Sequence, residues 1–211
     1  TIALVVPNAE RSHIQGGGSA RVRAHRPVAI LHALRSRGLD VVHAPGCSIA
    51  KRLPALRGDV HVLFLDADGA AVASERAERF AFLWQDAPAP GVDPARFGAR
   101  ITAELVPDHT GDWELGLAAV GPAVLRVDGE VVIDLSVPQT GWTYFGQGSP
   151  ELRALVPLEA GQRATVEVEL GLTDRAMLRG LSVGVRAPET EDPMEAAVRA
   201  AHTAFELDST E

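Results

Sequence analysis

Three consecutive glycines, Gly16, Gly17 and Gly18, form the part of the sequence that most clearly indicates binding. They follow an apolar run at residues 2–6 that is typical of a buried strand, and the Pro-Asn pair behind that run indicates a turn. Glycine is used where the backbone needs positive φ or where another group must approach it closely. Because roughly twenty residues separate this strand from the next predicted helix, the loop is long enough to favour a functional role over that of a plain surface loop.

Two other chemistries use glycine-rich loops, and the surrounding residues disfavour both. A phosphate-binding loop would continue into Gly-Lys-Ser/Thr, or into a G-x-G-x-x-G that opens a helix, and neither is present around Gly18. A serine nucleophile would stand in a G-x-S-x-G elbow, which Ser19 lacks. We therefore expect the Ser19 hydroxyl to donate a hydrogen bond within the loop and to take no part in catalysis.

Aromatic residues make up only 5% of the chain, yet Trp142, Tyr144 and Phe145 fall within four positions of a predicted loop. Exposed rings can stack on the apolar face of a sugar, with neighbouring polar groups fixing its hydroxyls. The alternative is that these rings close the end of a hydrophobic core. Core packing is the stronger expectation for Trp84 and Trp113, which lie on strand-like segments, and for Trp142 both interpretations stay open.

Other candidate chemistries lack the residues that they need. The seven histidines do not cluster, and the Asp-Ala-Asp-Gly sequence at residues 66–69 lacks the later bidentate glutamate of a calcium loop. We predict a turn there, no metal site and no cofactor. Cys47 is the only cysteine, so no intrachain disulfide can form, and the compartment, cytoplasmic or secreted, stays open.

Charge is distributed unevenly along the chain, whose net charge is −8. Residues 1–57 hold nine Lys/Arg and two Asp/Glu, about +7, and the rest hold eleven and twenty-six, about −15, which indicates two parts with different neighbours. No aromatic residues interleave with Arg21, Arg23 and Arg26, which disfavours a nucleic-acid partner. We expect these arginines to pair with carboxylates of a partner domain. No run approaches the roughly 20 apolar residues of a membrane span.

The two ends of the sequence predict pieces of an α/β domain. Residues 28–35 have helical spacing, with Pro27 near the first turn and Gly38 just past the end, and residues 40–44 indicate a second strand. Strand, loop, helix and strand predict a right-handed crossover in a parallel sheet, although two strands cannot form a sheet that stands alone. The alanine-rich residues 194–203 predict one more helix.

The middle of the chain predicts an antiparallel domain. Short alternating strands are indicated at residues 60–65, 100–105, 113–117, 123–127, 130–135, 165–170 and 181–185. The Asp128-Gly129 pair between two of them is the strongest hairpin signal in the chain. Strands at this spacing are typical of a β-sandwich or barrel.

Parts of the sequence are similar to known families. Val-Pro-Asn-Ala at residues 6–9, Gln-Gly-Gly-Gly-Ser-Ala-Arg-Val at 15–22 and His-Arg-Pro-Val at 25–28 resemble the start of the α/β-sandwich domain of family 3 glycoside hydrolases, the β-glucosidase type. This resemblance covers about residues 1–46. It implies that the glycine-rich loop lies over a sugar site built mainly by a preceding barrel domain.

A second resemblance covers about residues 58–187. Gly-Asp-Trp-Glu-Leu-Gly-Leu at residues 111–117, Leu-Arg-Val-Asp-Gly at 125–129, Phe-Gly-Gln-Gly-Ser at 145–149 and Val-Pro-Leu-Glu-Ala-Gly at 156–161 resemble the protective-antigen type of β-sandwich. Some family 3 glycosidases carry this domain as an insert.

The family resemblance also implies which catalytic groups are absent. Retaining glycosidases need two carboxyl groups about 5–5.5 Å apart. In the resembled family the nucleophile belongs to the barrel domain, and the acid/base glutamate follows the resuming helix, where Glu206 and Glu211 stand in no recognisable motif. We therefore assign no catalytic residue. The residues expected to bind substrate are Gln15, Gly16, Gly17, Gly18, Ser19, Arg21, Trp142 and Phe145.

We predict an α+β multidomain chain: an incomplete α/β sandwich (strand, loop, helix, strand) at residues 1–57, an inserted antiparallel β-sandwich at 58–187, and a linker with a resuming helix at 188–211. The predicted role is that of a non-catalytic portion of a β-glucosidase-like glycoside hydrolase that lines the sugar site and shapes aglycone selectivity. Its partners would be a glycoside and the barrel domain of the same polypeptide. The alternatives are a stand-alone carbohydrate-binding or adhesion module, or a structural role in a homo-oligomer.

Overall fold

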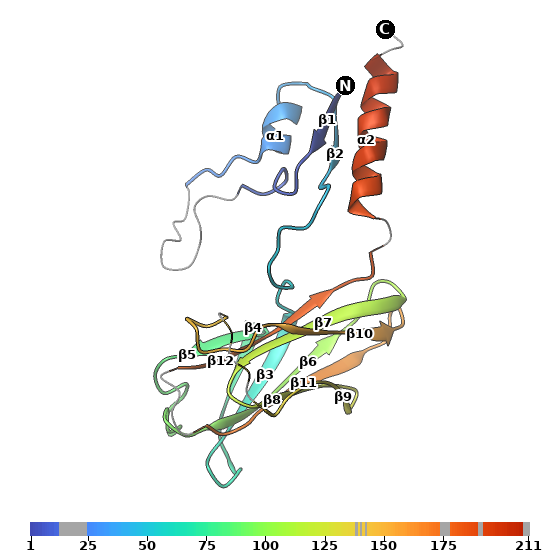
Figure 1. The fold of residues 1–211 in the computed structure, drawn as a ribbon. Helices are drawn as coiled ribbons and strands as arrows, with labels where there is room; N and C mark the ends of the chain where they lie inside the picture. The colour runs from blue at the N-terminus through green and yellow to red at the C-terminus, as the bar shows by residue number, and fades with distance from the viewer. Residues whose placement is uncertain are drawn as a thin grey trace. The chain divides into compact units, whose positions relative to one another are not determined.

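The chain forms two compact units in the computed structural model (Figure 1). The smaller unit comprises Thr1–Ala50 and Glu189–Glu211, and the larger comprises Lys51–Pro188. The structure describes residues 1–12, 25–137, 139, 141, 143–173, 178–189 and 192–208. The predicted site residues that lie outside this described part are Gln15, Gly16, Gly17, Gly18, Ser19, Arg21 and Trp142.

The smaller unit contains a two-stranded parallel sheet with a helix on each face. Its elements are β1 (Ile2–Val5), α1 (Ile30–Arg35), β2 (Val41–Ala44) and α2 (Pro193–Asp208). Leu31 of α1 packs against Val41, whereas Ala197 and Ala200 of α2 pack against Ala44 on the opposite face. These elements match the predicted strand, helix, strand and final helix, but a two-stranded sheet does not establish an α/β sandwich, which stays a proposal.

Local sequence explains where the helices begin and end. Asp192 caps α2, because its Oδ1 atom accepts the backbone N–H groups of Met194 at 2.7 Å and Glu195 at 3.3 Å. Pro193 occupies the first helical position, where its missing N–H costs nothing. α1 stops before Gly38, whose φ of +77° lies in the left-handed region that terminates helices.

The larger unit consists of two antiparallel sheets, as predicted for the middle of the chain (Figure 1). The six-stranded sheet has the order β4-β3-β6-β11-β8-β9, and the four-stranded sheet has the order β10-β7-β12-β5. The strands are β3 (Arg57–Leu65), β4 (Ala71–Arg79), β5 (Ala81–Trp84), β6 (Gly98–Leu105), β7 (Gly111–Val120), β8 (Ala123–Val127), β9 (Glu130–Leu135), β10 (Leu152–Leu158), β11 (Ala164–Leu170) and β12 (Arg179–Arg186).

One apolar core lies between these sheets. Alternate residues point inward, such as Val60 and Val62 of β3 and Leu181 and Val183 of β12, all of them fully buried. Trp113 is also buried in this core, as expected for a strand residue. The sandwich therefore buries a core of its own.

The predicted hairpin between β8 and β9 is confirmed. Asp128 and Gly129 have φ values of +50° and +87°, as a two-residue hairpin turn with positive φ at both central positions requires. The Asp128 carboxylate also accepts the backbone N–H of Thr165 at 2.7 Å. Asp128 is thus a turn residue that ties the hairpin to the neighbouring strand β11.

The lead-in segment, residues 51–56, lies beside β12 on the edge of the four-stranded sheet. Leu56 donates its N–H to the Val183 carbonyl and Val185 donates to the Pro54 carbonyl, both at 2.9 Å. Ala55 pairs with Gly184 in an antiparallel bridge. The chain therefore enters the sandwich next to the strand by which it leaves.

Two glycines make room for this segment. Gly116 of β7 and Gly184 of β12 are register partners. A Cβ atom at Gly184 would lie 2.5 Å from Leu53 Cβ, and one at Gly116 would lie 3.0 Å from the Glu151 carboxyl carbon. The missing side chains form a glycine seat, Gly116 with Gly184, on which Leu53 and Glu151 rest.

Charged groups hold the lead-in segment over the glycine seat. The Glu151 side chain is only 5% exposed, and both of its oxygens accept the Leu53 N–H at 3.1 Å. Arg153 donates from Nε to Glu151 at 2.8 Å and from Nη2 to the Lys51 carbonyl at 3.3 Å. Glu151 thus holds a backbone group and is itself neutralised by Arg153.

We predict that Gly184→Ala lowers the free energy of unfolding by about 1–3 kcal/mol, as expected for overpacking. The new Cβ would displace Leu53 from the glycine seat. Urea unfolding of the wild type and the variant measures the loss. The same substitution should cost clearly less in a Leu53→Gly background, because the clashing Cβ is then gone. Equal cost in both backgrounds would contradict the proposed contact.

A second prediction concerns acid stability. Burial raises the pKa of Glu114, but the Arg186 and Arg153 guanidinium groups outweigh burial and hold this pKa below its usual value of 4.5. A carboxylate with a lowered folded-state pKa stabilises the fold above the unfolded-state pKa and loses that contribution as pH falls through the folded value. Below about pH 4.5, the wild type should therefore lose about 1 kcal/mol more stability than Glu114→Gln. Parallel acid-unfolding slopes for the two proteins would contradict this.

Candidate functional site

The loop that contains the aromatic group covers the outer face of the four-stranded sheet. Tyr144 is buried and packs with Ala118, Val120 and Leu178. Ser149 anchors the loop, because its N–H donates to the Ala119 carbonyl at 2.9 Å and its Oγ accepts the Ala119 N–H at 3.1 Å. The aromatic loop, described at residues 141 and 143–149, is therefore fixed to β7.

A tight turn orients two neighbouring rings differently. Gln147 donates its N–H to the Tyr144 carbonyl at 3.0 Å, and Phe145 and Gly146 between them have φ values of +53° and +81°. These are the backbone signs of a type I′ turn, which favours Asn or Gly at the first central position. Phe145 stands there instead, with 79% of its surface exposed. Tyr144 is thus a packing residue, whereas Phe145 contacts no hydrophobic core.

Close packing keeps Tyr144 in place. A Cβ atom at Gly148 would lie 2.5 Å from Cδ2 of Tyr144, and one at Gly141 would lie 2.6 Å from the backbone nitrogen of Pro150. Any larger residue at either position would push the aromatic loop off the sheet. Gly148 therefore lets the Tyr144 ring lie close to the loop backbone, and Gly141 lets the backbone at Pro150 do the same.

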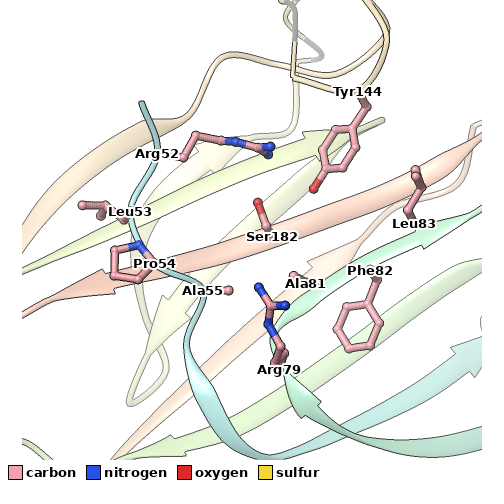
Figure 2. Close-up of a pocket in the computed structure, with 10 residues that line it drawn as sticks. All are labelled: Arg52, Leu53, Pro54, Ala55, Arg79, Ala81, Phe82, Leu83, Tyr144 and Ser182. Carbon is pink, nitrogen blue, oxygen red and sulfur yellow. The ribbon is translucent and has the colours of Figure 1, made fainter. Parts of the chain in front are cut away.

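A pocket of about 370 Å³ opens between the lead-in segment and the aromatic loop (Figure 2). It lies over β5 and β12, and the end of β4 reaches it. The residues that line it are Arg52, Leu53, Pro54, Ala55, Arg79, Ala81, Phe82, Leu83, Tyr144 and Ser182. We call it the arginine pocket, because both of its charged residues are arginines.

Two polar residues of the arginine pocket, Arg52 and Ser182, lie close to Tyr144. Its hydroxyl points towards Ser182, and the Arg52 guanidinium lies beside its ring, 5.8 Å from the ring centroid (Figure 2). Burial raises the pKa of the Tyr144 phenol above 10, although interactions with Ser182 and Arg52 oppose that shift. The phenol therefore keeps its proton at neutral pH and can donate a hydrogen bond.

Of the predicted site residues, only Phe145 lies in the described part of the chain, where 79% of its surface is exposed. Arg52, Arg79 and Ser182 were not singled out from the sequence. They come from three distant segments that meet only because β5 and the lead-in segment flank β12. Nothing in their local sequence marks them.

Within the described residues, no group of three or more His, Cys, Asp or Glu side chains could hold a metal ion. The same part of the chain contains no helix that is both long and apolar enough to cross a membrane. The arginine pocket and the exposed Phe145 are candidate binding features.

Two curated relatives match nearly the whole chain. A β-glucosidase of Rhizobium radiobacter is 35% identical over 203 residues, which is 92% of this chain and 24% of that protein. A probable β-glucosidase H of Aspergillus clavatus is 27% identical over 192 residues, which is 86% of this chain and 23% of that protein. The chain thus spans about a quarter of the length of these relatives.

A solved structure shares the fold. The β-glucosidase from Kluyveromyces marxianus in complex with glucose aligns with a TM-score of 0.75 over 96% of this chain and 27% of that one, at 22% identity. The antiparallel sandwich occupies the larger unit, and residues 51–193, well over half of the chain, match the PA14 domain. The chain therefore belongs to the PA14 domain family.

Proposed function

We propose that this chain is a non-catalytic portion of a β-glucosidase-like glycoside hydrolase, in which the PA14 sandwich is inserted into an α/β domain and shapes the choice of aglycone. The similarity to β-glucosidases supports this, because it extends over 92% of the chain and so includes both units. The catalytic carboxylates would come from parts of the polypeptide outside this chain, including a barrel domain.

The two ends of the sandwich support an insertion. Residues 54–56 form hydrogen bonds with β12, the last strand of the larger unit, so the chain enters and leaves the sandwich on adjacent segments. Domains whose ends lie close together can be inserted into a host domain with little disturbance. The host would be the α/β domain that begins with β1, α1 and β2 and resumes with α2.

The observation that carries the proposed role in selectivity is the conformation of Phe145. A bulky residue at positive φ costs on the order of 1–2 kcal/mol, and a ring that is 79% exposed recovers little of that through packing. Contact with a ligand or with another part of the enzyme would account for the ring. We propose that Phe145, together with Trp142, stacks on the aglycone.

The glycine-rich loop has a different proposed role, which rests on the resemblance alone. Gln15, Gly16, Gly17, Gly18, Ser19 and Arg21 would lie nearer the glycone, where the absence of side chains leaves room for the sugar.

The test compares Phe145→Asn and Phe145→Tyr in the intact enzyme, with one small and one bulky aglycone. Asparagine suits the type I′ turn, so we expect an unchanged or higher melting temperature together with a severalfold higher KM for the bulky aglycone alone. Tyrosine keeps the ring and should leave both KM values near those of the wild type. A stacked ring is worth about 1 kcal/mol, which fits an effect of this size.

Three results would contradict this proposal. Equal losses on both aglycones with a lower melting temperature would show that Phe145 stabilises the loop. Unchanged kinetics in Phe145→Asn would show that the Phe145 ring takes no part in substrate selection. Sugar binding without any hydrolysis by the intact protein would favour the carbohydrate-binding alternative.

A further inference from the structure

We propose that the arginine pocket binds the carboxylate of an acidic sugar, with uronates as the ligand class. The proposal rests on the residues of the larger unit alone. It does not require the enzyme setting proposed above, so either proposal can fail without the other.

The first argument is charge. No Asp or Glu lines the arginine pocket, although residues 58–211 hold twenty-six of them. The ion pairs of the described part of the chain use other arginines: Arg76, Arg100, Arg153, Arg163 and Arg186. Arg52 and Arg79 form no ion pair with a described carboxylate, and both are exposed. Two guanidinium groups beside one pocket attract an anion from solution.

The acidic group that acts on Tyr144, Glu151, forms no ion pair with Arg52 or Arg79 in the described part of the chain. Glu151 is close enough to influence the Tyr144 phenol, but its oxygens are occupied by the Leu53 N–H and by Arg153. The Glu151 charge is neutralised by its ion pair with Arg153, at 2.8 Å. The positive charge of the pocket is therefore available to a ligand.

The second argument is the combination of groups. A guanidinium fork matches a planar carboxylate through two parallel hydrogen bonds. The hydroxyls of Tyr144 and Ser182 can donate to or accept from sugar hydroxyls, and Leu83 and Pro54 provide apolar wall. Polar groups beside an apolar wall, in a pocket of about 370 Å³, are typical of a small-molecule site.

The experiment titrates the 211-residue chain with methyl β-D-glucuronide and with methyl β-D-glucoside, which carries a hydroxymethyl group in place of the carboxylate. Backbone amide NMR shifts report affinity and location. We expect the glucuronide to bind at least about tenfold tighter than the glucoside, with the largest shifts at Ser182 and Leu83 and weaker binding at high salt.

Variants locate the site. Arg52→Gln and Arg79→Gln should each weaken glucuronide binding about tenfold. Tyr144→Phe should weaken it severalfold and leave the buried ring in place. Arg76→Gln is the matched control, because it removes the same charge from the same strand, β4, outside the pocket, and should change affinity less than about twofold. If Arg79→Gln does not fold, Arg79→Lys keeps the charge without the fork and should still bind severalfold more weakly.

Several outcomes would overturn the proposal. Equal affinity for glucuronide and glucoside, or binding of neither, would exclude a carboxylate site. An equal loss of glucuronide affinity in Arg76→Gln and Arg79→Gln would show that only the net charge of the protein matters. Inorganic phosphate or acetate that binds as tightly as the glucuronide would leave a general anion site and remove the assignment to a sugar.

Discussion

The candidate site depends on the absence of two side chains, at Gly116 and Gly184. These register partners leave the outer face of the four-stranded sheet open, so Leu53 and the Glu151 carboxylate can lie directly on it. Glu151 then accepts the Leu53 N–H and holds the lead-in segment against β12. Residues 54–56 are hydrogen-bonded to β12, but without this seat the chain before them, which carries Arg52 over the sheet, would lose its contact with the outer face.

The opposite wall of the arginine pocket is the aromatic loop, which is also fixed to the four-stranded sheet. Ser149 joins the aromatic loop to β7 through Ala119, and Gly148 lets the Tyr144 ring lie close against the loop backbone. The turn after Tyr144 then directs Phe145 away from the sheet. Both walls are irregular segments fixed to one rigid sheet, the arrangement in which proteins commonly carry binding residues. The sandwich core supplies rigidity, and the segments that cross its outer face supply the recognition groups.

The sequence was most informative where local pattern decides structure. Strands with clear alternation, the Asp128-Gly129 hairpin and the helix end before Gly38 were all expected from their own residues. Strands β4 and β10 were not expected, and β5 was indicated only by the strand-like segment around Trp84. β4 reads as a run of Ala, Glu and Arg, which favours helix in isolation, and it is a strand because it pairs with β3 at the edge of the sheet. β5 has only four residues, and β10 contains Pro157, which an edge strand tolerates. The arginine pocket could not be predicted from the sequence, because Arg79 lies at the end of β4 and Leu83 lies on β5. The family resemblance supplied the sugar-binding context, which neither periodicity nor composition could provide.

Amide hydrogen exchange at Leu53 tests the central claim, that Glu151 fixes the lead-in segment over the glycine seat. The Leu53 N–H is bonded only to the Glu151 carboxylate among the described residues, whereas the Leu56 N–H is bonded to the Val183 carbonyl. The account predicts a protected Leu53 amide in the wild type. In Glu151→Ala, exchange at Leu53 should be at least about tenfold faster, with a smaller change at Leu56 and shifted Tyr144 ring signals. An unprotected Leu53 amide in the wild type, or protection that survives in Glu151→Ala, would contradict it.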